Sequence, residues 1–220
     1  ILTEKDDAWV DLNLPEMRWL DDGKRFLWVS ERDGWRRPYS VSANGYDIRP
    51  LTKGSFDAMS IQSVDEAGGW VYYIASPDNV TQRYLYRSKL DGSRTDERVT
   101  PARFQGWNSY NFSPNAHWAV QISSSFGKYS KIDLLDLRSG SVARSIVDNA
   151  SAQAKLDKLT KGPQEFFRID IGSDVSLDGW MMKPPNFDPA KKYPVLFYAY
   201  TEPAGTTVND QWAGSQYFWY

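Results

Sequence analysis

The sequence predicts a mainly β protein built from four-stranded antiparallel sheets. Short apolar strands alternate with Asp-Gly and Asn-Gly pairs, which accept the positive φ angles that tight hairpin turns require. Aromatic residues make up 15% of the 220 residues, with 10 Trp and 13 Tyr, and these residue types favour strands. The pattern of strands and turns recurs about every 45 residues, which is the length of a four-stranded propeller blade.

The repeat has three units, in which Trp28, Tyr73 and Val120 take equivalent positions. Three blades do not close a propeller ring, so the sequence predicts a partial β-propeller with further blades upstream. A sandwich of short antiparallel strands is the alternative that the composition permits. The strands are predicted at residues 15–19, 25–30, 39–41 and 47–52 in the first unit, 60–64, 70–75, 84–87 and 97–100 in the second, and 109–113, 118–123, 131–136 and 142–146 in the third.

After residue 147 the composition changes, and the next residues predict a linker that contains a short helix. Ala, Leu and Lys become frequent there, and Asp148, Asn149 or Ser151 can cap the start of the helix. The chain is therefore expected to divide into three parts, which are the blades at 1–147, the linker at 148–162 and a further part at 163–220.

The third part begins with two predicted strands and continues to an apolar run. Residues 165–171 and 177–184 have the pattern of two strands around a tight turn. The run from Val195 to Tyr200 is apolar at every position. A strand of that kind is buried on both faces, as in the centre of an α/β sheet. We therefore expect a buried central strand that ends at Tyr200.

Three stretches carry a resemblance to a known family. They are Trp28-Val29-Ser30-Glu31-Arg32-Asp33-Gly34, Phe112-Ser113-Pro114, and Phe187 to Tyr200, which includes Lys191-Lys192-Tyr193-Pro194. They resemble the prolyl oligopeptidase family of serine peptidases, and within it the dipeptidyl peptidase IV branch. The resemblance covers nearly the whole chain. It implies that residues 1–147 are the C-terminal blades of an eight-bladed propeller and that residues 163–220 are the N-terminal part of an α/β-hydrolase domain.

The resemblance also implies a serine exopeptidase that releases Xaa-Pro or Xaa-Ala dipeptides from the N-termini of short peptides. In this family the tyrosine at the end of the strand helps to form the oxyanion hole, a role that falls on Tyr200. The family segment that lines the substrate cavity falls on Asp11, Leu12 and Asn13, for which a strand at a blade edge is the alternative. This chain has Thr201-Glu202 where the family has a small residue and a glycine. The family further implies a homodimer in the full-length protein and a periplasmic or other extracytoplasmic location.

The 220 residues contain no complete serine-hydrolase triad, so we expect this stretch alone to be inactive. There is no G-x-S-x-G elbow, and the one histidine, His117, follows a blade turn where we expect it in solvent. One His and no Cys lead us to expect no metal and no other cofactor.

The net charge of -2 gives no reason to expect nucleic acid as a partner, and no apolar segment approaches the roughly 20 residues of a membrane span. The competing interpretation is a propeller binding or scaffold protein whose hydrolase domain has lost activity.

Overall fold

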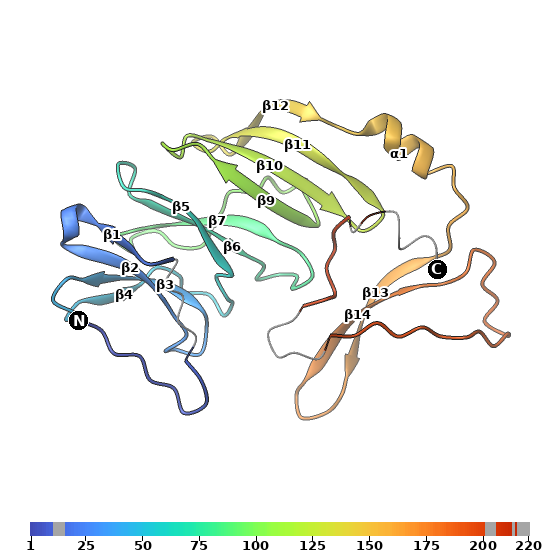
Figure 1. Ribbon diagram of the computed structural model, residues 1–220, viewed down its shortest axis with the longest axis horizontal. Helices are drawn as coiled ribbons and strands as arrows, with labels where there is room; N and C mark the ends of the chain where they lie inside the picture. Colours follow the sequence, from blue (N-terminus) through green and yellow to red (C-terminus); the bar gives the residue numbers. More distant parts are fainter. Residues whose placement is uncertain (11–15, 201–205, 213, 215–220) are drawn as a thin grey trace.

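The computed structural model describes residues 1–10, 16–200, 206–212 and 214, and strands dominate it (Figure 1). One α-helix, α1 (Ala150–Leu156), and one short 3-10 helix, η2 (Asp21–Gly23), occur among these residues. The strands are β1 (Arg18–Leu20), β2 (Arg25–Ser30), β3 (Arg37–Ser42), β4 (Ile48–Pro50), β5 (Ser60–Asp65), β6 (Trp70–Ala75), β7 (Tyr84–Lys89), β8 (Glu97–Arg98), β9 (Trp107–Phe112), β10 (Trp118–Ser125), β11 (Lys128–Asp136), β12 (Ser141–Val147), β13 (Gln164–Asp170) and β14 (Ser176–Met182).

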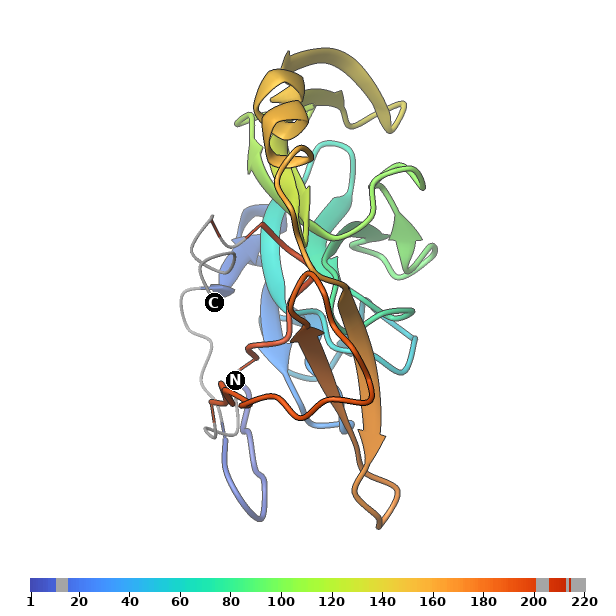
Figure 2. The same ribbon diagram turned by 90° about the vertical axis from the view of Figure 1, so that its right-hand side faces the viewer.

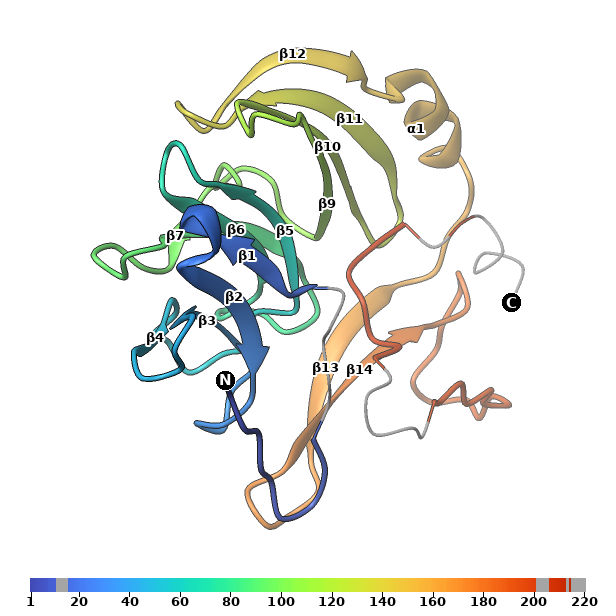
Figure 3. The same cartoon turned by 60° about the vertical axis from the view of Figure 1, so that its left-hand side comes forward.

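The strands β1 to β12 form three four-stranded sheets, which we call blade 1 (β1–β4), blade 2 (β5–β8) and blade 3 (β9–β12). In each blade every strand pairs antiparallel with its neighbour in the sequence. The predicted repeat is confirmed, because Trp28, Tyr73 and Val120 each lie in the second strand of a blade. Figure 3 shows the blades following one another around an arc, with β1, β5 and β9 on its inner side.

The hydrophobic core lies between neighbouring blades. In β6, Tyr73 packs toward blade 1, whereas Tyr72 and Ile74 pack toward blade 3. Successive side chains of a strand point to opposite faces of the sheet, so blade 2 is buried on both faces. Leu85 of β7 and Leu135 of β11 are fully buried in the seam between blades 2 and 3. A two-sheet sandwich buries one face of each sheet, so this packing favours propeller-like blades over the sandwich.

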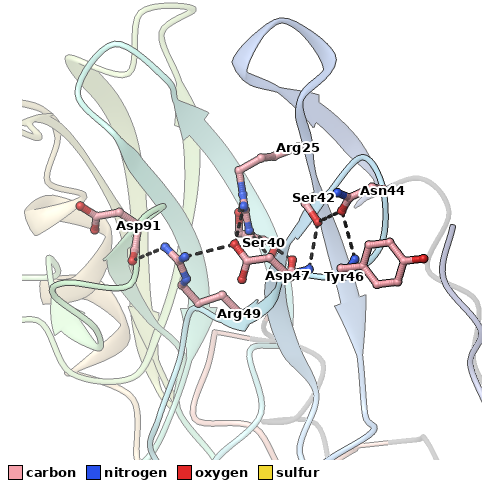
Figure 4. Close-up of polar contacts among 8 residues, drawn as sticks. All are labelled: Arg25, Ser40, Ser42, Asn44, Tyr46, Asp47, Arg49 and Asp91. Carbon is pink, nitrogen blue, oxygen red and sulfur yellow. Dashed lines mark hydrogen bonds and ion pairs between the residues drawn. The ribbon is translucent and has the colours of Figure 1, made fainter.

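A polar network joins blades 1 and 2 at their edge (Figure 4). Arg25 donates hydrogen bonds to the hydroxyl and carbonyl oxygens of Ser40, at 2.7 and 2.9 Å, and to the carboxylate of Asp47 at 2.8 Å. Arg49 reaches the same carboxylate at 3.2 Å and donates to the carbonyl of Asp91, in blade 2, at 2.9 Å. The hydrogen bond from Arg25 lowers the pKa of Asp47. The network therefore links a turn of blade 1 to a turn of blade 2.

The predicted linker helix and the predicted hairpin are both present. The carboxylate of Asp148 accepts a hydrogen bond from the N–H of Ala150 at 2.9 Å, at the start of α1. Asn149 instead uses its side-chain amide to donate to the carbonyl of Ser130 at 2.7 Å. In the described residues β13 and β14 pair with each other alone, and their turn lies at one end of the molecule (Figures 1 and 2). No larger sheet that this hairpin would open is seen in that part of the chain.

The predicted buried strand at Val195–Tyr200 is wrong for this structure. Residues 191–200 have no regular secondary structure, and Phe197 in the middle of the run is 88% exposed. Burial on both faces requires a paired strand on each side, and no described strand pairs with this run. The apolar pattern identifies residues that favour burial, but the sheet that would bury them is not among the described residues.

Candidate functional site

The N-terminal segment is fixed to blade 1 through the carboxylate of Glu4. Its Oε1 accepts hydrogen bonds from Nε1 of Trp28 and from Nη2 of Arg32, both at 2.7 Å, and its Oε2 accepts one from the hydroxyl of Ser30 at 3.0 Å. The Glu4 side chain is only 14% exposed. A carboxylate with three donors, one of them cationic, is a strong anchor. The donors belong to the motif at residues 28–34, so the family-like stretch of blade 1 holds the start of the chain.

A second carboxylate, that of Glu16, fixes the chain at the seam between blades 1 and 2. Its Oε2 lies 2.5 Å from Nη2 of Arg36, and its Oε1 accepts a hydrogen bond from the N–H of Ile61 in β5 at 3.1 Å. The guanidinium of Arg36 also donates to the carbonyl of Ala58. The backbone N–H of Arg36 donates to the carboxylate of Asp57 at 2.8 Å. The chain is therefore tethered at Glu4 and at Glu16, on either side of residues 5–15, by partly buried carboxylates.

The predicted substrate-lining residues Asp11, Leu12 and Asn13 lie outside the described residues. The structure describes the two ends of their segment, at Glu4 and Glu16. Strand β1 begins soon after Glu16 and lies on the inner side of the arc of blades (Figure 3). The substrate-lining role of residues 11–13 stays a prediction.

The predicted oxyanion donor, Tyr200, is described and partly accessible. Tyr200 is 56% exposed, and it ends a run without regular secondary structure. A tyrosine hydroxyl can donate a hydrogen bond to a ligand, so the residue type is compatible with the predicted role. Thr201 and Glu202, where the chain departs from the family pattern, lie outside the described residues. Tyr200 and residues 11–13 are thus not seen together in one site.

The chain returns to the blades at residues 206–212, a contact that the sequence did not predict. Asp210 accepts hydrogen bonds from the side chain of Gln82, before β7, and from the backbone N–H of Phe126, after β10. Its own N–H donates to the carbonyl of Thr81 at 2.8 Å. The two partners of the carboxylate lie 128 and 84 positions away. No short motif or periodicity marks such a pair, so only the folded chain could show it.

The sequence also led us to expect His117 in solvent, no metal site and no membrane-spanning segment. His117 lies in the turn between β9 and β10, where it is partly buried and has Nη2 of Arg138 2.7 Å from its Nε2. Within the described residues, no group of three or more His, Asp and Glu side chains is arranged to hold a metal ion. In that same part of the chain, no helix has the length and apolar character that crossing a bilayer requires.

Comparison with known sequences identifies the blades. Residues 1–129 match the family described as "Dipeptidyl peptidase IV (DPP IV) N-terminal region". A protein of Aspergillus flavus named "Probable dipeptidyl peptidase 4" is 27% identical over an alignment of 229 positions, which covers 96% of this chain and 28% of the relative. A protein of the same name from Emericella nidulans is 30% identical over an alignment of 193 positions, which covers 84% of this chain and 24% of the relative. The chain thus spans about a quarter of the length of these relatives.

Comparison with solved structures gives the same result for the fold. The crystal structure of Porphyromonas gingivalis dipeptidyl peptidase 4 superposes with a TM-score of 0.82 at 27% sequence identity. The superposition covers 94% of this chain and 29% of that enzyme. The family match covers residues 1–129 of 220, which is more than half of the sequence. The chain therefore belongs to the family of dipeptidyl peptidase IV N-terminal regions, the propeller region found in this branch of the prolyl oligopeptidases.

Proposed function

We propose that the full-length protein is a serine exopeptidase that releases Xaa-Pro or Xaa-Ala dipeptides from the N-termini of short peptides. The observation that carries this proposal is the match of residues 1–129 to the dipeptidyl peptidase IV N-terminal region. The TM-score of 0.82 with the Porphyromonas gingivalis enzyme supports it. The serine, the imidazole base and the carboxylate would come from outside this chain, because the 220 residues hold a single histidine and no G-x-S-x-G elbow.

In this proposal the blades restrict access to short peptides, and residues 163–220 begin the hydrolase domain. Asp11, Leu12 and Asn13 would supply extended subsites for the peptide. The anchors at Glu4 and Glu16 support this assignment, since a segment that recognises a substrate must be held in one position by the residues around it. The inner position of β1, which follows the segment, supports it as well (Figure 3).

Tyr200 would act in the acyl-transfer step. When the serine oxygen attacks the scissile carbonyl carbon, the carbonyl π electrons move to the oxygen, and the resulting oxyanion accepts a hydrogen bond from the phenol. Loss of one preorganised donor of this kind lowers the rate by roughly 10²–10³. Tyr200 is 56% exposed, so the residue is not enclosed in a core.

Dipeptide release by the full-length protein tests the proposed function. An Xaa-Pro p-nitroanilide with a free N-terminus should be cleaved, and the same compound with an acetylated N-terminus should not, because an exopeptidase of this type recognises the free amine. Equal turnover of both compounds would point to a different specificity. No turnover of either, in a folded and pure protein, would contradict the assignment as an enzyme.

The second candidate is a propeller that binds a partner without catalysis. Glu202 favours this candidate, because it would bring a negative charge close to an oxyanion donor where the family has glycine. The amino-acid sequence that follows Tyr220 in the full-length protein separates the two candidates. A G-W-S-x-G elbow with a later Asp and His supports the peptidase, and a substituted serine or histidine supports the binding protein.

A further inference from the structure

Asp210 ties residues 206–212 to the seam between blades 2 and 3 with both of its carboxylate oxygens. Its Oδ2 accepts a hydrogen bond from Nε2 of Gln82 at 2.7 Å, and its Oδ1 accepts one from the backbone N–H of Phe126 at 2.8 Å. The N–H of Asp210 donates to the carbonyl of Thr81 at 2.8 Å. Hydrogen bonds to an ionised carboxylate are shorter and stronger than those between neutral groups. Through its side chain and its backbone N–H, this one residue therefore connects three points on two blades.

The amide of Gln82 is held in the orientation that Asp210 needs. Its Oε1 accepts a hydrogen bond from the hydroxyl of Tyr84, which leaves Nε2 to face the carboxylate. Gln82 and Tyr84 are both buried, and the guanidinium of Arg98 lies 3.7 Å from the centre of the Tyr84 ring. Because Oε1 of Gln82 already accepts a hydrogen bond, its Nε2 group is the part that faces residues 206–212. Gln82 therefore presents a donor that matches a carboxylate.

Further contacts around Asp210 show that residues 206–212 follow the blade surface closely. A Cβ atom at Gly106 would lie 2.2 Å from the carbonyl oxygen of Ser124 and 3.0 Å from that of Asp210, so the glycine permits the close approach. Beyond Asp210, the N–H of Trp212 donates to the hydroxyl of Ser124 at 3.1 Å, and its ring centre lies 4.3 Å from that of Tyr129. The docked segment thus has a second anchor, on blade 3.

We propose that Asp210 is a positioning residue for Tyr200, which it serves by locking the segment that follows this tyrosine onto the seam between blades 2 and 3. The inference rests on the oxyanion role proposed above for Tyr200. Thr206, the first described residue of the docked segment, follows Tyr200 by six positions, and six residues span at most roughly 22 Å. Anchoring at Asp210 limits where the phenol can lie relative to the blades.

Exchanging the side-chain amide of Gln82 with the carboxylate of Asp210 tests this proposal in the full-length protein. Asp210→Asn leaves an acceptor for the Phe126 N–H but turns an amide N–H₂ toward Nε2 of Gln82. Gln82→Glu places two carboxylates against each other at a contact that is 2.7 Å long in the native protein. The double variant restores a donor opposite an acceptor, while the hydroxyl of Tyr84 and the N–H of Phe126 keep their acceptors. Asp174→Asn, at an exposed carboxylate in the β13–β14 turn, is the matched control.

Two readouts are expected to change together. In each single variant kcat should fall by about tenfold or more with KM nearly unchanged, because misplacement of a catalytic group by about 1 Å is costly. Hydrogen exchange at the N–H groups of Phe126 and of residue 210 should become faster by about tenfold or more, because both hydrogen bonds open when residues 206–212 leave the seam. The double variant should recover to within about threefold of the native protein in both readouts, and Asp174→Asn should match the native protein.

The double variant decides the outcome, even where a single variant does not fold. A double variant that is no better than the worse single variant would overturn the proposal, and so would single variants that retain native kcat and native exchange. Recovery of exchange without recovery of kcat would show that the contact docks the segment but does not position Tyr200. Exchange needs no turnover, so an inactive native protein would count against the proposed peptidase function and leave the docking contact measurable.

Discussion

The hydroxyl of Tyr73 donates a hydrogen bond to Oδ1 of Asp96 at 3.0 Å, in a seam where Tyr73 is completely buried. The hydroxyl of Ser88 lies 3.0 Å from the same phenol oxygen. The other carboxylate oxygen of Asp96 accepts the backbone N–H groups of Lys53 and Gly54, at 3.0 and 3.2 Å, in the chain that leaves blade 1. A tyrosine in the centre of blade 2 therefore fixes, through one carboxylate, the connection from blade 1.

Tyr73→Phe should lower the free energy of unfolding by about 2 kcal/mol, because it leaves a carboxylate without one of its donors. Urea denaturation followed by tryptophan fluorescence measures the change. Tyr46→Phe, at a side chain that is 92% exposed, is the control and should stay within about 0.5 kcal/mol of the native protein. Equal effects of the two substitutions would show that the buried hydrogen bond contributes nothing.

The blades should lose stability in alkaline solution through their buried tyrosines. Burial raises the pKa of Tyr73 and of Tyr110. Above about pH 10 these phenols ionise in the unfolded chain and stay protonated in the folded one, so the free energy of unfolding falls as pH rises. Each such group contributes at most about 1.4 kcal/mol per pH unit to the slope.

Tyr110→Phe should therefore make the alkaline slope shallower than that of the native protein. The hydroxyl of Tyr110 lies 2.6 Å from that of Thr100, so the substitution also lowers stability at neutral pH by about 1 kcal/mol. Denaturation curves between roughly pH 8 and pH 11 separate the two effects, because only the titration depends on pH. An unchanged slope in the variant would contradict the account.

Gly106→Ala should destabilise the seam between blades 2 and 3 more than a positive φ angle alone explains. The φ angle of Gly106 is +81°, and a Cβ there would meet the carbonyl oxygen of Ser124 at 2.2 Å. We expect a loss of about 3 kcal/mol or more. Gly172→Ala is the matched control, because its φ is +87° with no atom within 4 Å of the added Cβ, and it should cost about 1–2 kcal/mol. Similar losses for both would show that space at Gly106 is not restricted.

Glu16→Gln should loosen the segment at residues 5–15. The ion pair of Glu16 with Arg36 is only 20% and 16% exposed, and loss of its charge should cost about 1–3 kcal/mol. Limited proteolysis within residues 5–15 should become faster as the tether weakens. Glu66→Gln is the control, because its ion pair with Arg18 is 3.7 Å long and about half exposed, and it should change neither readout. Unchanged proteolysis in the Glu16 variant would contradict the tether.

The blades could be predicted because their signals are local. Strand β6 is bounded by Gly69 and Ser76, and its residues Trp70–Ala75 are apolar or aromatic throughout, so its position follows from a short window. Turn residues and a repeat of about 45 residues then give the order of strands in each sheet. The registers do not follow in the same way, because bulges shift them within the pairs β5–β6, β10–β11 and β11–β12.

The end of the chain could not be predicted in the same way. The run Val195–Tyr200 has the composition of a buried strand, but burial depends on neighbouring strands that a short window does not contain. The contact of Asp210 with Gln82 joins residues 128 positions apart, and a single Asp between Asn209 and Gln211 carries no signal of its partner. Polar contacts of this kind are decided by tertiary structure.

The most direct test of the proposed function is the steady-state rate of Tyr200→Phe in the full-length protein with an Xaa-Pro p-nitroanilide. If Tyr200 is the oxyanion donor, kcat should fall by roughly 10²–10³ with an unchanged melting temperature, because the substitution removes one donor to the oxyanion and Tyr200 is 56% exposed. A kcat equal to that of the native enzyme, in a variant that folds normally, would contradict it.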